Sequence, residues 1–187
     1  MSAISPIPGM ERHAVEGAVQ PEAYLEARWY AAYTRANHEK LVAEQLAQKS
    51  IEHFLPTYES LRRWKDRKMR LQMPLFPGYV FIKFALRERL GVLQVSSLVR
   101  LVSFGGQPKA LSEEEIVTLR RALEQGLRAE PHPYLAVGRR VRIKSGALAG
   151  LEGILLRRRG QWRVVLSVRP IMSSMVVEVG AEDIARE

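Results

Sequence analysis

The chain has 187 residues, a formal net charge of +9 and no cysteine, so disulfides, thiol catalysis and cysteine-ligated zinc are excluded. No apolar run approaches the roughly 20 residues that a membrane span requires, and the N-terminus lacks the basic start and apolar core of a secretory signal. We therefore expect a cytoplasmic protein of one domain or two small ones, without membrane association.

In chain order, the pattern of apolar side chains first predicts an α+β domain. Residues 1–27 contain several prolines and glycines without periodicity, and we expect them to form a disordered leader. The next segments predict a strand at 29–34, a helix at 36–49, strands at 51–56 and 71–84, a short helix at 87–94 and a strand at 98–104. A further helix follows, and this order indicates helices packed over a mainly antiparallel sheet.

The two longer predicted helices of this domain are supported by the spacing of apolar residues in one and by a capping box in the other. In the first, Val42 and Leu46 recur at helical spacing, and polar residues that include Glu39 occupy the opposite face. Ser112 and Glu115 form a capping box at the start of the last helix, because the serine hydroxyl accepts from the third helical amide while the glutamate reaches back.

The second part of the chain predicts a small all-β domain. The segment 128–136 contains two prolines and little periodicity, which is typical of an interdomain linker. After it, short apolar strands are separated by glycines, and five such strands in about 50 residues indicate a small barrel.

The positive charge lies in the parts of the chain that we expect to fold. The net charge is −2 over residues 1–28, +6 over 29–130 and +5 over 131–187. Nucleic acid is the commonest partner of such proteins, because lysine and arginine release the counterions condensed on phosphates. Charge that serves solubility alone is the alternative.

Signatures of catalysis are missing from the sequence. There is no P-loop, no glycine-rich dinucleotide fingerprint and no Gly-x-Ser-x-Gly elbow. The four histidines, His13, His38, His53 and His132, are not paired at metal-ligand spacing. We expect no enzyme, no catalytic residue, no metal and no cofactor.

The most basic stretch of the chain runs into its most aromatic one. Residues 62–70 carry six positive charges and one negative charge, and an apolar segment follows at 74–81. An aromatic residue among arginines suits base stacking, so we expect nucleic-acid contact, with a solvated hairpin loop as the alternative. The expected contact residues are Arg62, Arg63, Trp64, Lys65, Arg67 and Lys68. The three arginines at 157–159 fit RNA contact and a hairpin tip equally well.

Several of these segments, in this order, resemble the NusG family of transcription factors. The matching segments of the N-terminal domain are Trp29-Tyr30 opening a strand, Glu39-Lys40 in a helix, and Phe76-Pro77-Gly78-Tyr79-Val80-Phe81. The glycine pattern Gly138-x-x-Val141-x-Ile143-x-x-Gly146, followed by Gly150-x-x-Gly153, resembles a KOW domain. The similarity covers nearly everything from Arg28 onward.

The resemblance implies a fold. It implies an α+β protein whose N-terminal antiparallel sheet is flanked by helices, an NGN-like domain at 28–127. After the linker at 128–136, it implies a small five-stranded SH3-like β-barrel, the KOW domain, at 137–187.

The resemblance also implies a function that composition does not give. In the family, an apolar surface of the N-terminal domain docks on the clamp helices of the RNA polymerase largest subunit and suppresses pausing. The corresponding residues here are Tyr33, Phe76, Pro77, Tyr79 and Phe81, although the spacing of the four aromatic residues alone favours their burial in the core. Arg35 and Lys40 fall where basic side chains face the upstream fork or the displaced non-template DNA strand.

For the barrel, the resemblance implies recruitment of other factors, such as a small-subunit ribosomal protein or the Rho terminator. Leu148 lies at the tip where some relatives present an aromatic residue to the ribosomal partner. We expect a monomer. The basicity and the 62–70 arm favour an operon-specific paralogue similar to RfaH or to capsule-locus regulators, but the threonine-rich stretch of RfaH is replaced near 90–93. The alternative is an RNA- or ribosome-binding KOW protein.

Overall fold

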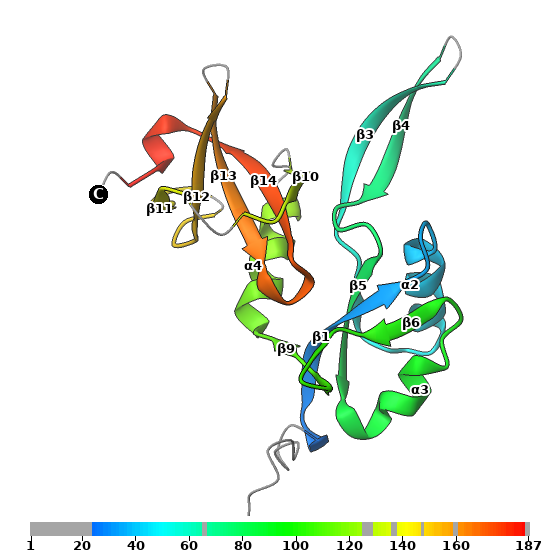
Figure 1. The fold of residues 1–187 in the computed structure, drawn as a ribbon. Helices are drawn as coiled ribbons and strands as arrows, with labels where there is room; N and C mark the ends of the chain where they lie inside the picture. Colours follow the sequence, from blue (N-terminus) through cyan, green and yellow to red (C-terminus); the bar gives the residue numbers. More distant parts are fainter. Residues whose placement is uncertain are drawn as a thin grey trace, which may run out of the picture.

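The computed structural model describes residues 24–64, 67–124, 129–135, 138–146, 148–158 and 161–185. The leader predicted at 1–27 lies mostly outside these ranges. Within them the chain forms two domains, each built on an antiparallel five-stranded sheet (Figure 1). None of the helices in these ranges is both long and apolar enough to cross a membrane.

The predicted strands and helices of the N-terminal domain occur in the predicted order, with additional strands between them that were not predicted. Its elements are β1 (Ala27–Thr34), α2 (Glu39–Gln48), β2 (His53–Phe54), β3 (Thr57–Trp64), β4 (Arg67–Pro74), β5 (Tyr79–Ala85), η1 (Leu86–Glu88), α3 (Arg89–Leu93), β6 (Leu98–Leu101), β7 (Ser103–Phe104), β8 (Gln107–Pro108), β9 (Ala110–Leu111) and α4 (Glu113–Glu124). The sheet has the order β2-β5-β1-β6, with β9 also paired to β1, and all pairs are antiparallel. The predicted α+β class is confirmed.

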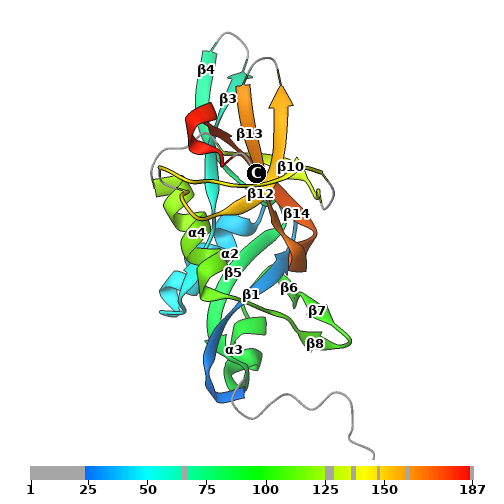
Figure 2. The same ribbon diagram turned by 90° about the vertical axis from the view of Figure 1, so that its left-hand side faces the viewer.

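The two faces of this sheet pack against different layers, because successive side chains of a strand point to opposite faces. On one face, Tyr30 of β1 and Ile82 of β5 pack against the helices α2 and α3 through residues such as Val42 and Val92. The opposite face carries Trp29, Ala31 and Phe81 and is covered by α4 and the barrel domain (Figures 1 and 2).

A single apolar cluster joins the two domains across this second face. It runs from Phe81 of the sheet and Leu119 of α4 to Leu166, Ile171 and Met175 of the barrel. The turn between the last two barrel strands lies beside the N-terminal sheet in both views (Figures 1 and 2). The barrel is therefore packed against the sheet face that also carries the predicted aromatic site.

Helix α4 is fixed to the same face by polar contacts around Trp29. The Trp29 indole N–H and the Lys83 ammonium both donate to Oε2 of Glu113, each at 3.0 Å. The hydrogen bond from Lys83, followed by that from Trp29, holds the pKa of the Glu113 carboxyl below its ordinary value. The Arg120 guanidinium lies 5.1 Å from the centroids of both the Trp29 and Phe54 rings.

The predicted capping box of α4 is present. The Glu115 amide donates to the Ser112 hydroxyl at 3.2 Å, and the Ser112 amide donates to Oε2 of Glu115 at 2.8 Å. Two otherwise unpaired amides of the helix start are satisfied in this way.

The strand predicted at 71–84 is divided into β4 and β5. Strand β4 ends at Pro74, and the chain turns before β5 begins at Tyr79, with Gly78 at a φ of 83°. A left-handed residue cannot continue a ladder, and glycine is the residue that adopts it without strain. Strand β4 pairs only with β3 within the described chain, so the two form a separate ribbon that projects from the sheet (Figure 1).

The barrel domain contains five strands, the number predicted, but the first of them lies in the segment expected to be a linker. Its elements are β10 (Ala129–Pro133), β11 (Arg140–Arg142), β12 (Glu152–Arg158), β13 (Gln161–Val168), η2 (Arg169–Ile171), β14 (Ser173–Val179) and η3 (Ala181–Asp183). The sheet order is β10-β14-β13-β12-β11. Proline cannot donate to a central ladder, and β10, with Pro131 and Pro133, accordingly lies at the sheet edge.

Candidate functional site

The four aromatic residues predicted to bind a partner lie on one face of the N-terminal sheet. The register of β1 and β5 places Tyr33 opposite Tyr79, and their rings meet edge-on with centroids 5.5 Å apart. Phe76, in the turn before β5, meets Phe81 edge-on at 5.9 Å. Such T-shaped contacts are the favoured geometry of aromatic pairs.

Burial separates these aromatic residues into two kinds. Phe76 and Phe81 are 1% and 0% exposed and belong to the apolar cluster that reaches the barrel. Tyr33 is 38% exposed, Tyr79 is partly buried and Pro77 is exposed. A partner that meets the molecule in this conformation would therefore contact Tyr33, Pro77 and Tyr79 and would not reach Phe76 or Phe81.

A buried glutamate holds the turn that carries this surface. The Gly78 amide donates to Oε1 of Glu39 at 2.6 Å, and Glu39 is only 4% exposed. The Gly78 carbonyl accepts from the Thr34 amide at 2.8 Å, and a Cβ at position 78 would lie 3.2 Å from the Tyr33 ring. The sequence-based placement of Glu39 on the solvent face of its helix is therefore wrong, because helical spacing does not reveal a backbone donor 39 residues away.

A basic residue lies over the exposed tyrosine, and two others follow it in the chain. Arg100 of β6 pairs with Tyr33 across the strands, and its guanidinium carbon lies 5.6 Å from the centre of the ring. Arg35 and Lys40, both exposed, follow at the end of β1 and the start of α2. None of these three side chains forms an ion pair with a described residue. Arg100 was not among the residues that the sequence singled out.

The turn that carries Arg35 is tied to a neighbouring turn. The Arg35 amide donates to the Ser97 carbonyl at 2.9 Å, and His38 Nδ1 lies 2.8 Å from the Ser97 hydroxyl. Asn37 and Ser97 both have left-handed backbones, with φ of 61° and 68°. Arg35 is thus mounted on one of a hydrogen-bonded pair of turns.

The other predicted nucleic-acid contacts lie away from the aromatic face. Arg62, Arg63 and Trp64 occupy the outer half of β3, and Arg67 and Lys68 pair with them in β4. Lys65 lies outside the described residues, as do the side chains from 62 to 68. The ribbon projects beyond the sheet, and the β12–β13 hairpin of the barrel projects to the same side (Figures 1 and 2).

The predicted contact residue of the barrel is not accessible in this conformation. Leu148 is 3% exposed and belongs to the apolar cluster shared by the two domains. The described residues contain no group of three or more histidine, aspartate or glutamate side chains arranged to hold a metal ion.

Comparison with known proteins assigns the chain to a family. A family model described as "Transcription termination factor nusG" matches residues 27–120, which is 94 of the 187 residues. The chain belongs to the NusG family. The resemblance inferred from the sequence motifs is therefore confirmed, whereas the operon-specific, RfaH-like assignment stays a prediction.

Curated NusG relatives cover most of the chain at moderate identity. The transcription termination/antitermination protein NusG of Pseudomonas aeruginosa is 25% identical over 145 residues, which are 70% of this chain and 81% of the relative. The NusG of Lactococcus lactis is 27% identical over 172 residues, or 83% of this chain and 91% of the relative. This NusG-family chain is thus a member of a group of transcription termination and antitermination factors.

A solved structure supports the fold of both domains. The structure described as "Domain interaction in Thermotoga maritima NusG" matches with a TM-score of 0.53 and 21% sequence identity. It covers 86% of this chain and 97% of that chain, so both the α+β domain and the barrel are included.

Proposed function

We propose that this NusG-family protein is a transcription elongation and antitermination factor that binds the clamp helices of the RNA polymerase largest subunit. The observation that supports it most is the convergence of Tyr33, Pro77 and Tyr79 on one sheet face, above the buried Phe76 and Phe81. Partly exposed tyrosines over an apolar base are typical anchors of protein interfaces. The role requires no catalytic residue, cofactor or metal.

The basic residues beside this surface suit the non-template DNA strand of the transcription bubble. Arg100 lies over Tyr33, Arg35 follows at the end of β1 and Lys40 begins α2, and a polymerase that docks on the tyrosines would bring a single strand toward these exposed cations. Arginine and lysine neutralise the phosphates, and an exposed ring can stack on a base. By holding both polymerase and DNA, the N-terminal domain would keep the clamp closed and suppress pausing and termination.

The barrel is proposed to recruit a further factor in the cytoplasm, such as a small-subunit ribosomal protein or the Rho terminator. Leu148 is buried between structural elements, so contact through it requires the apolar cluster to open. The protein would act as a monomer, since the two domains cover each other's apolar surfaces.

Retention of core RNA polymerase by the immobilised full-length chain tests this function. Polymerase should be retained, and a competing excess of free chain should release it. The rival function is an RNA- or ribosome-binding KOW protein. Retention of ribosomes without polymerase would contradict the elongation-factor role and support the rival.

The basic ribbon β3–β4 gives a separate prediction about nucleic acid. Replacing Arg62, Arg63 and Lys65 with alanine should reduce the salt dependence of nucleic-acid affinity by about one unit of slope per lost phosphate contact. The measurement is binding of labelled single-stranded DNA over a series of salt concentrations. Replacing the exposed cations Lys49, Arg89 and Arg121 is the charge-matched control. An equal slope in both variants would assign the ribbon to solubility or to a protein partner.

A further inference from the structure

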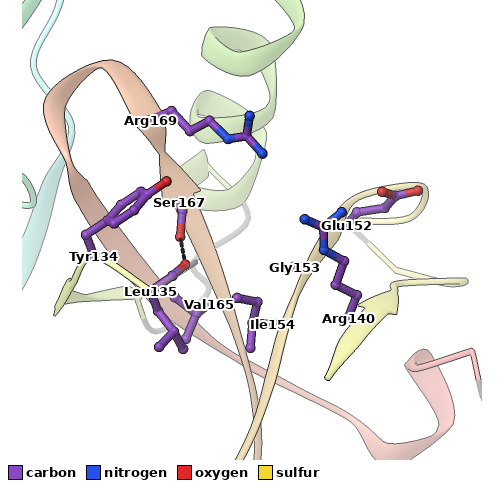
Figure 3. Close-up of a pocket in the computed structure, with 9 residues that line it drawn as sticks. All are labelled: Tyr134, Leu135, Arg140, Glu152, Gly153, Ile154, Val165, Ser167 and Arg169. Carbon is purple, nitrogen blue, oxygen red and sulfur yellow. Dashed lines mark hydrogen bonds between the residues drawn. The ribbon is translucent and has the colours of Figure 1, made fainter. Parts of the chain in front are cut away.

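The barrel domain contains a small pocket on the side of its sheet that does not face the inner core. It lies where the residues after β10 meet β11, β12 and β13, and its volume is about 180 Å³ (Figure 3). Drug-sized ligands occupy pockets of about 300–1,000 Å³. The space therefore suits a group about as large as one amino-acid residue.

The floor of the pocket is apolar. Leu135, Ile154 and Val165 line it, and Val165 is only 1% exposed. These residues belong to a second apolar cluster of the barrel, separate from the inner core of Val164 and Leu166. An apolar side chain entering the pocket would leave water for this floor, which is favourable.

The rim of the pocket is cationic. The guanidinium groups of Arg140 and Arg169 point toward the cavity from two sides (Figure 3). Neither forms an ion pair or a side-chain hydrogen bond with any residue that the structure describes. The carboxylate of Glu152 also lines the pocket, and its Oε1 is paired with Arg142 at 2.8 Å.

Two hydroxyl groups complete the rim. Ser167 donates to the Leu135 carbonyl at 2.8 Å and so fixes the segment that follows β10 across the pocket. The Tyr134 hydroxyl points toward the space between Ser167 and Arg169 (Figure 3). The pocket thus combines an apolar floor with a rim that carries the guanidinium groups of Arg140 and Arg169 and the hydroxyl of Tyr134.

We propose that this pocket binds the C-terminal residue of a partner protein, with an apolar side chain on the floor and the free carboxylate between Arg140 and Arg169. A C-terminal residue carries both groups on one Cα, which matches the size of the pocket, and guanidinium–carboxylate contacts are strong, directional hydrogen bonds. This inference rests on the partner-binding role proposed for the barrel and is independent of polymerase docking by the N-terminal domain.

The test uses the full-length chain labelled with ¹⁵N and small probes of defined chemistry. N-acetyl-leucine should shift the amide resonances of Leu135, Gly153 and Ser167 in a saturable manner. N-acetyl-leucinamide lacks the carboxylate, and N-acetyl-glycine lacks the apolar side chain, so both should bind at least about tenfold more weakly. N-acetyl-Leu-Glu-amide distinguishes an internal acidic side chain from a C-terminal carboxylate and should also bind weakly.

Substitutions of the arginines in the rim provide the second part of the test. Arg140→Gln and Arg169→Gln should each weaken N-acetyl-leucine binding by about tenfold, because each removes a charge-assisted hydrogen bond. Arg89→Gln, on an exposed helix of the other domain, is the matched control and should leave binding unchanged. The assignment would be overturned by any of three results. N-acetyl-leucine and N-acetyl-leucinamide could bind equally well, the rim variants could bind N-acetyl-leucine as well as the unsubstituted chain does, or the pocket amides could show no shift. The rim variants should retain polymerase as the unsubstituted chain does. A negative result for N-acetyl-leucine binding would therefore contradict the pocket assignment without contradicting the elongation-factor role.

Discussion

Replacing Phe81 with alanine is expected to lower the free energy of unfolding of the N-terminal domain by about 3–5 kcal/mol. Phe81 is 0% exposed and lies in the middle of β5, where its ring packs on Phe76 and on Phe54, 6.2 Å away. Alanine would leave a cavity under the whole aromatic surface. Because domains of this size are stable by only about 5–15 kcal/mol, much of the domain's stability would be lost.

Urea unfolding of the full chain, followed by circular dichroism, measures this loss. Phe81→Leu keeps most of the apolar volume and should cost less than the alanine variant. Loss of polymerase binding by Phe81→Ala at unchanged stability would show that Phe81 is an interface residue in solution and that the barrel does not bury it.

Tyr79→Ala should weaken polymerase binding and leave the stability of the domain nearly unchanged. Tyr79 is partly exposed beside Tyr33, so truncation removes an interface anchor and leaves most of the core intact. Polymerase affinity should fall by about 1–3 kcal/mol, which corresponds to roughly 5- to 150-fold in Kd. Titration of labelled full-length chain with core polymerase gives the affinity, and thermal unfolding gives the stability.

Leu90→Ala is the control for this substitution. Leu90 is 75% exposed on α3, on the side of the sheet opposite the aromatic face, and its removal should change neither quantity. A large drop in the unfolding temperature of Tyr79→Ala would instead assign Tyr79 to the core. Equal polymerase binding by both variants would show that the clamp helices dock elsewhere.

Local signals made much of the fold predictable. Helical spacing located α2, and the capping box at Ser112 and Glu115 located the start of α4. These features depend on neighbours within a few residues, which a sequence displays directly.

Features that depend on distant partners were not predictable in this way. Glu39 is buried because it binds the Gly78 amide, and Arg100 reaches Tyr33 through strand pairing. The segment with Pro131 and Pro133 has the composition of a linker, yet β14 offers it an unpaired edge. The apolar cluster shared by the two domains likewise depends on how they pack together, which the apolar pattern of either domain alone does not contain.

The position of β10 limits how far the two domains can separate. Only four residues lie between Glu124, the end of α4, and Ala129, the start of β10, so the barrel is tethered within about 17 Å while β10 stays paired. If β10 leaves β14, the connection runs from Glu124 to Gly138, and its fully extended reach grows to about 48 Å.

Both prolines of β10 lack an amide donor, which suits the strand to this edge position. The pairing of one edge strand with β14 therefore sets the reach of the connection between the domains: while β10 is paired the barrel stays close to the N-terminal domain, and release of β10 would let the barrel move farther from it.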